Sequence, residues 1–92
     1  MAKIFVVDRD YEADVKCFKV ERDYDADLLV FFVDRDFDAK SDEKWFYVSR
    51  DFEATTKIFW VARDYEADLK VLFVDRDYDA KWTKGHALQN RL

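Results

Sequence analysis

The chain has 92 residues, of which 50% are hydrophobic and 40% are charged, so we expect one small domain with a charged surface. Its net charge of −5 excludes the clustered positive field that nucleic-acid binding needs. Its single cysteine excludes an intramolecular disulfide and fits a reducing compartment, so we expect a cytoplasmic protein.

The sequence also gives no sign of a membrane segment. No apolar run approaches the roughly 18 residues of a membrane-spanning helix. The apolar start of the chain is interrupted at Asp8, which is too early for a signal peptide. We therefore expect no membrane partner.

The first half of the chain contains three copies of one acidic unit. The stretch RDYEAD begins at Arg9, and near-copies begin at Arg22 and Arg35, each 13 residues further on. Before each arginine, Phe and Val recur at two-residue spacing, as at Phe5 and Val7. This alternation is typical of a β-strand. Each unit is thus expected to be a strand followed by a turn.

Two extra residues, Ser41 and Asp42, mark a seam at the middle of the chain, where the arginine spacing is 15 rather than 13. Residues 3–40 align without gaps on residues 44–81 and are identical at 25 of 38 positions. We infer that a three-unit block was duplicated. A single domain, 1–92, is expected, in which pseudo-symmetric halves complete one core.

The turns between units carry few of the usual signals, because the chain has no proline and one glycine. The bends must therefore use the Asp, Glu, Ala and Lys residues that end each unit. Identical units fit a winding in which each unit returns to a neighbouring coil better than they fit a plain meander.

Strand parity assigns faces to the residues of each unit. In the first unit Phe5, Val7, Arg9, Tyr11 and Ala13 share one side, which we expect to face the core. An arginine near a core must be paired and hydrogen-bonded, and its stem can pack on the aromatic ring. We therefore predict a structural Arg–Asp network that joins the repeats. Its members are Arg9, Arg22, Arg35, Arg50, Arg63 and Arg76 with Asp10, Asp23, Asp36, Asp51, Asp64 and Asp77.

Cys17 occupies a column of the repeat that is otherwise hydrophobic, with Ile4, Val30 and Trp45 among its members. It is expected to be a small buried residue rather than a reactive thiol. The tail, 82–92, leaves the repeat, and we expect a packed closing element there.

The VDRDYEAD-like units, the central two-residue interruption, the length near 90 and the closing Trp-to-Leu segment resemble the septknot family of small bacterial β proteins. The resemblance covers residues 3–92. It implies an antiparallel-rich β domain whose halves are interwound into a backbone knot with seven crossings. The resemblance supplies no catalytic or cofactor-binding residues. The expected fold is therefore mainly β: six 13-residue strand-plus-turn repeats in two interwound, knotted halves, with a short closing element.

Candidate chemical sites are weak. The acidic unit at Asp8 has the spacing of a calcium loop, but Ala13 and Lys19 stand where that loop needs Gly and Glu. His86 and Cys17 stand apart, so no metal site is predicted. One histidine and few serines give no catalytic constellation. We expect neither an enzyme nor a cofactor.

The residues that break the repeat are the candidate contacts, namely Trp45, Trp60, Trp82 and His86. Tryptophans at these positions either fill the core or form an exposed binding patch. Two functions stay open. One is a monomeric structural or protein-interaction module with an unknown protein partner. The alternative is a small-ligand or carbohydrate-binding domain that uses exposed Trp and acidic residues.

Overall fold

The structure is a computed structural model that describes residues 2–89 and 91–92. Short strands alternate with single 3₁₀ turns along these residues. The strands are β1 (Ala2–Val6), β2 (Val15–Lys19), β3 (Leu28–Phe32), β4 (Lys44–Tyr47), β5 (Thr56–Trp60), β6 (Leu69–Phe73) and β7 (Lys81–Trp82). The 3₁₀ turns are Asp10–Glu12, Asp23–Asp25, Asp36–Asp38, Asp51–Glu53, Asp64–Glu66 and Asp77–Asp79.

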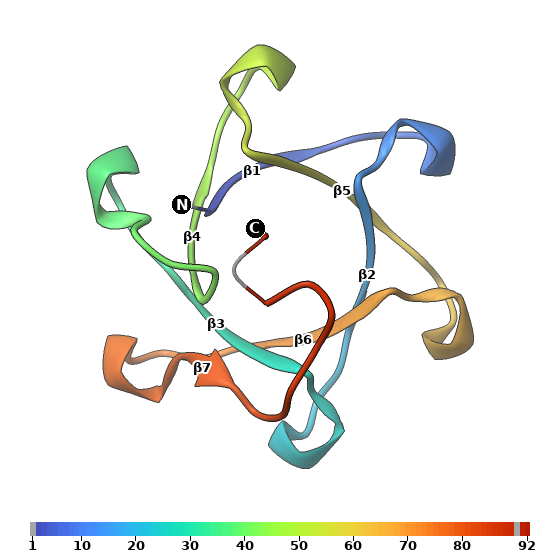
Figure 1. Cartoon of the computed structure of the whole chain (residues 1–92), viewed down its shortest axis with the longest axis vertical. Helices are drawn as coiled ribbons and strands as arrows, with labels where there is room; N and C mark the ends of the chain where they lie inside the picture. Colours follow the sequence, from blue (N-terminus) through green and yellow to red (C-terminus); the bar gives the residue numbers. More distant parts are fainter. Residues whose placement is uncertain (1, 90) are drawn as a thin grey trace.

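The strands β1 to β6 close into a barrel, seen along its axis in Figure 1. Their order is β4-β1-β5-β2-β6-β3, and a further pairing of β3 with β4 closes the ring. Every pairing within this ring is parallel. Closure matters because it leaves these short strands without open edges.

The two halves of the chain alternate around the barrel. Strands β1, β2 and β3 come from the first half, and each lies between strands of the second half. The chain therefore passes around the barrel axis twice, and neither half forms a sheet without the other. This arrangement confirms the expected mainly β fold with interwound halves.

The antiparallel-rich sheet implied by the family resemblance is wrong. The antiparallel pairing in the described residues is the one between β7 and the start of β3, where Leu28 lies opposite Trp82. The physical reason lies in the connections, because each unit returns to the start of the barrel before its next strand begins. A returning connection gives parallel strands, whereas a tight hairpin turn would give antiparallel ones.

The connections form arms that project from the ring in Figure 1. The arm after β1 is typical: its two ends bond to the strand between β1 and β2, from Val7 N–H to Ile58 O at 2.9 Å and from Asp14 N–H to Lys57 O at 2.8 Å. Its bend is the 3₁₀ turn, in which Glu12 N–H donates to Arg9 O and Ala13 N–H donates to Asp10 O. Acidic residues and alanine thus make the bends without glycine.

The barrel interior is filled by the parity opposite to the predicted one. Its buried layers are Ala2, Val15, Leu28, Thr56 and Leu69, followed by Ile4, Cys17, Val30, Trp45, Ile58 and Val71. The Phe column of the repeat lies outside the barrel and is half-buried, as at Phe18, which packs with Leu29 and Leu72. A parallel barrel wrapped by arms buries both faces of its strands, so both parities of the sequence are apolar.

The tail closes the end of the barrel where the strands begin. Leu92 is buried in the core, and the partly buried Trp82 and Leu88 pack against the core cluster. The C-terminus lies inside the ring in Figure 1. Asp42 at the seam holds this end, because its carboxylate accepts bonds from Leu92 N–H at 3.1 Å and Trp82 Nε1–H at 3.2 Å. The expected packed closing element is confirmed for the described tail residues.

Candidate functional site

The opposite end of the barrel is open and aromatic. Because the barrel strands are parallel, their carboxyl ends meet at one end, as in other parallel barrels. Each strand contributes the residue three positions before its arginine. These residues are Val6, Lys19, Phe32, Tyr47, Trp60 and Phe73, and we call them the aromatic mouth.

The rings of the aromatic mouth contact one another. Phe32 and Phe73 stack with centroids 4.6 Å apart, and Phe32 lies 4.8 Å from Tyr47. Trp60 meets Phe73 edge-on at 5.9 Å. Tyr47 is 43% exposed, Val6 is 40% exposed and Phe32 is 36% exposed. The mouth is thus a continuous hydrophobic surface that solvent reaches.

Lys19 is the cation of the aromatic mouth. Strand order places it between Trp60 of β5 and Phe73 of β6. Its Nζ lies 5.4 Å from the centroid of the Phe73 ring, within cation–π range. A hollow of about 430 Å³ opens here, and Phe18, Lys19, Tyr47, Trp60, Val61 and Phe73 line it.

Burial raises the pKa of two side chains at this end of the barrel, the Tyr47 phenol in the mouth and the Cys17 thiol below it. Burial, with a smaller contribution from the charge of Asp68, raises the pKa of Cys17 to about 12. Burial and then the charge of Cys17 raise the pKa of Tyr47 to about 12. Both groups stay protonated at neutral pH, so Cys17 is a buried core residue and has no reactive thiolate.

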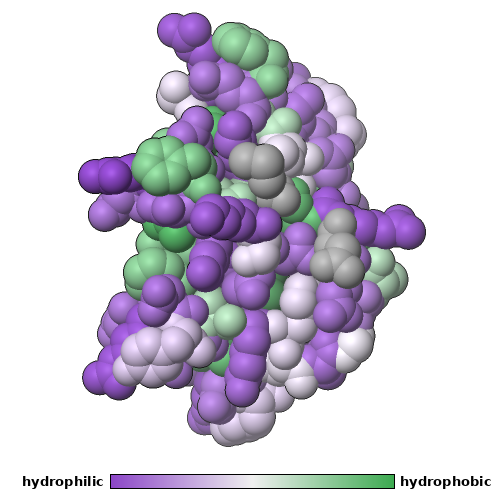
Figure 2. Space-filling model, turned by 60° about the vertical axis from the view of Figure 1, so that its left-hand side comes forward, coloured by the Kyte–Doolittle hydropathy of each residue, from purple (hydrophilic) through white to green (hydrophobic). Residues whose placement is uncertain are grey.

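Carboxylates follow the aromatic mouth closely. Asp8, Glu21, Asp34 and Asp75 each come two residues after a mouth residue, and all are exposed. Figure 2 shows hydrophilic side chains over much of one face of the molecule, with separate hydrophobic areas between them. The hydrophobic mouth is therefore followed on four strands by negative charge.

The structure separates the four predicted contact residues. Trp45 is fully buried, and its Nε1–H donates to Asp42 O at 2.7 Å. Trp60 is part of the aromatic mouth. Trp82 and His86 lie at the closed end, where their rings stack with centroids 5.6 Å apart. They do not form one patch, because alternate strands and the tail place them at opposite ends of the barrel.

The predicted Arg–Asp network is replaced by contacts within each arm. Every repeat arginine is exposed and lies 5.7–6.0 Å from the aromatic centroid two residues on, as Arg22 does over Tyr24. Arg22 also donates to the Tyr24 hydroxyl at 2.8 Å. Among the described residues, ion pairs within 4 Å join Lys3 to Asp36 and Lys84 to Asp27. The ring of His86 also approaches Asp27, with 3.7 Å between His86 Nε2 and Asp27 Oδ2. The stem-on-ring contact was predicted, but the joint between repeats was placed on the wrong aspartates.

The aspartates that join the halves stand at the start of the strands. Asp27 N–H donates to Lys70 O at 2.7 Å, and its Oδ2 accepts the Lys70 N–H at 3.1 Å. Asp14 and Asp68 clamp Lys57 and Lys16 in the same way. The sequence offered one signal for these residues. The repeat position that they occupy holds lysine in the last unit of each half.

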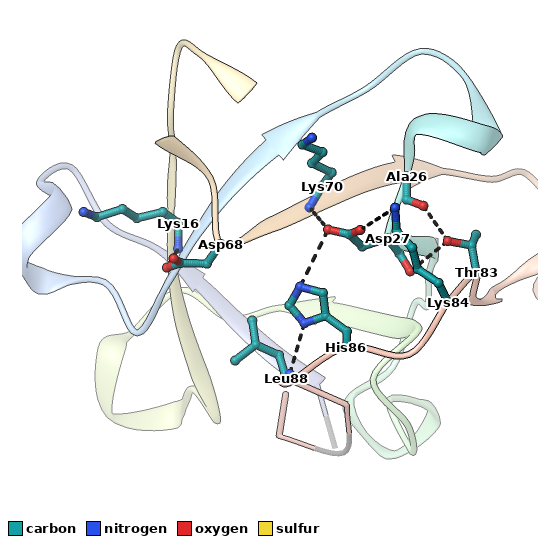
Figure 3. A network of polar contacts seen from close by, with 9 residues as sticks. All are labelled: Lys16, Ala26, Asp27, Asp68, Lys70, Thr83, Lys84, His86 and Leu88. Carbon is teal, nitrogen blue, oxygen red and sulfur yellow. Dashed lines mark hydrogen bonds and ion pairs between the residues drawn. The ribbon is translucent and has the colours of Figure 1, made fainter. Parts of the chain in front are cut away.

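Asp27 also anchors the tail, as Figure 3 shows. Lys84 Nζ lies 3.3 Å from Asp27 Oδ1, and His86 Nε2 lies 3.7 Å from Asp27 Oδ2. His86 Nδ1 accepts the Leu88 N–H at 3.0 Å. These contacts place the histidine in a structural network.

The described residues include no group of three His, Cys, Asp or Glu side chains that could hold a metal ion. In the same part of the chain, no helix is long and apolar enough to cross a membrane.

The comparison with known proteins gives one family. A family model described as the 7(1) septoil knot domain, Septknot, matches residues 1–83. No curated protein and no solved structure matches the chain significantly. The match spans all the repeats and ends in the tail, after Trp82 of β7. The chain therefore belongs to the Septknot family, as its repeated units predict.

Proposed function

We propose that this protein is a non-enzymatic, monomeric interaction module of the cytoplasm, which presents the aromatic mouth to another protein. The observation that carries the proposal is a mutually packed aromatic cluster at one end of a closed barrel, in which Phe32 and Tyr47 are exposed and Trp60 and Phe73 are half-buried. Aromatic side chains dominate the binding energy of protein interfaces. A closed barrel holds them in place before binding, so little ordering entropy is lost.

The alternative is a small-ligand or carbohydrate-binding domain. The hollow beside Trp60 favours it, because sugars stack on tryptophan rings and carboxylates stand nearby. Trp45 is unable to contribute, since it is fully buried. The exposed rings of the mouth continue beyond the hollow to Phe32, and this wider surface favours a protein partner.

Photo-crosslinking separates these functions. The photoreactive amino acid p-benzoylphenylalanine is placed at Tyr47 in the mouth or, as a control, at Tyr78 in an arm, and cells are irradiated. We expect a discrete protein adduct from position 47 that is absent from position 78. Equal adducts from both positions, or none from position 47, would contradict the proposal.

We also propose that the backbone is knotted, with the seven crossings that the family description names. Membership of the family and the alternation of the two halves around the barrel support this proposal. A knotted backbone suits a structural module because a chain end must be drawn back through the knot before the chain can unfold completely.

A further inference from the structure

The aromatic mouth already holds one ammonium group, that of Lys19. In the described residues Lys19 makes no ion pair within 4 Å, and its Nζ lies 5.4 Å from the Phe73 centroid. The other mouth positions hold Val, Phe, Tyr and Trp, so lysine is the exception in its column. The Phe73 ring thus accepts a cation on its face, as the negative face of an aromatic ring favours.

Charge around the mouth selects the same kind of partner. Asp8, Glu21, Asp34 and Asp75 are exposed just beyond it, and none of them is in an ion pair within 4 Å among the described residues. The chain as a whole carries a net charge of −5. Each of these carboxylates is followed by an exposed arginine that lies over the aromatic ring of its own arm. The net negative charge of the chain nevertheless repels anionic partners and attracts cationic ones.

We propose that the aromatic mouth binds a lysine-rich segment of a partner protein, with one lysine side chain seated on Trp60 and Phe73. This inference rests on the proposed function and names the chemistry of its partner. The alkyl stem of the incoming lysine covers the rings, and its ammonium takes the place of the Lys19 ammonium over Phe73. The carboxylates beyond the mouth then face the other lysines of the segment.

The test uses a short fluorescent peptide in which lysine alternates with serine, and the full protein. A matched peptide carries acetyl-lysine at every lysine, which keeps the stem and removes the charge. Binding is measured by the fluorescence anisotropy of the peptide. We expect the lysine peptide to bind and the acetylated peptide to bind at least about tenfold more weakly. Equal binding of the two peptides would overturn the proposal.

The variant Lys19→Ala tests the direction of the change in peptide affinity. It removes the competing ammonium and leaves the rings, so we expect the lysine peptide to bind about threefold to tenfold more tightly. Lys81→Ala is the matched control, because it removes the same charge from an exposed residue of β7 at the closed end. If Lys19→Ala weakens binding, or changes it no more than the control does, the proposal fails.

A loss-of-function variant completes the test. Trp60→Leu keeps a hydrophobic side chain and removes the ring face, and should weaken the peptide at least about fivefold. Thermal melting checks that the variant is folded, and Phe73→Leu replaces it if it is not. If crosslinking at position 47 succeeds while the lysine peptide fails to bind, the mouth is an interface for a partner of another chemistry. In that case this inference falls and the proposed function stands.

Discussion

Cys17 has no contact with solvent, and its surroundings determine how it titrates. Its side chain is fully buried in the barrel interior, so the thiolate is disfavoured and the pKa rises from 9.0 to about 12. Tyr47 above it is shifted in the same direction for the same main reason. Because burial raises both pKa values, both residues make the stability of the protein depend on pH in the alkaline range.

The free energy of unfolding should decrease at alkaline pH because of Cys17. Below about pH 9 the thiol is protonated in both states, and its contribution to stability is fully present. Between pH 9 and 12 only the unfolded thiol loses its proton, so stability falls by about 1.4 kcal/mol per pH unit from this group. Urea unfolding at a series of pH values measures this slope. Cys17→Ala should have a shallower slope, and identical slopes would contradict the burial effect.

At the scale of the elements, carboxylates at the strand starts join neighbouring strands. The repeat motif alone does not show which of its aspartates has this role. The motif contains several aspartates, and one signal separates the last of them from the one beside the arginine: its repeat position holds lysine at the end of each half. In the structure the last one clamps the neighbouring strand, whereas those beside the arginines lie in exposed arms. Both the register of the strands and the position of the tail depend on Asp27.

Replacing Asp27 should therefore destabilise the fold more than replacing an arm aspartate. Asp27→Ala leaves the Lys70 N–H without its side-chain acceptor and frees the tail, at a cost of about 1–3 kcal/mol. Asp23→Ala removes the same charge from the adjacent arm and should cost less than about 0.5 kcal/mol. Chemical denaturation compares the two variants. A larger loss for Asp23→Ala would instead favour the network of arm aspartates.

At the scale of the whole molecule, all the pairings of the barrel except that of β3 with β4 join distant parts of the chain. Ala2 lies opposite Trp45, and Leu28 lies opposite Val71. Such pairings require long loops to close, and the entropy of closure is lost before the stabilising contacts form. Folding is therefore expected to be slow. Folding would be slower still if the chain must also be threaded to form a knot.

Pulling the chain from both ends tests the proposed knot. A knotted chain tightens when it is stretched, so the measured contour length should be shorter than that of 92 extended residues. The control is the same protein cut at the seam after Lys40, whose two parts should separate completely. A full contour length for the intact chain would show that the backbone is unknotted.

The repeat, the duplication, the bends and the family could be predicted from the sequence, because 13-residue spacing and β-typical residues are local properties. Cys17 was correctly placed in the interior for the same reason, since its column is hydrophobic throughout. Which parity fills the barrel could not be predicted, because arms cover the outside and make both faces of the strands apolar.

Only the tertiary structure decided the direction of the strands and the composition of the candidate site. Lys19, Trp60 and Phe73 are separated by long stretches of sequence, and they meet because strands of the two halves alternate around the ring. Local preferences specify that a strand forms, but its neighbours are chosen by the closure of the whole barrel. The aromatic mouth exists because that closure brings parallel carboxyl ends together at one end.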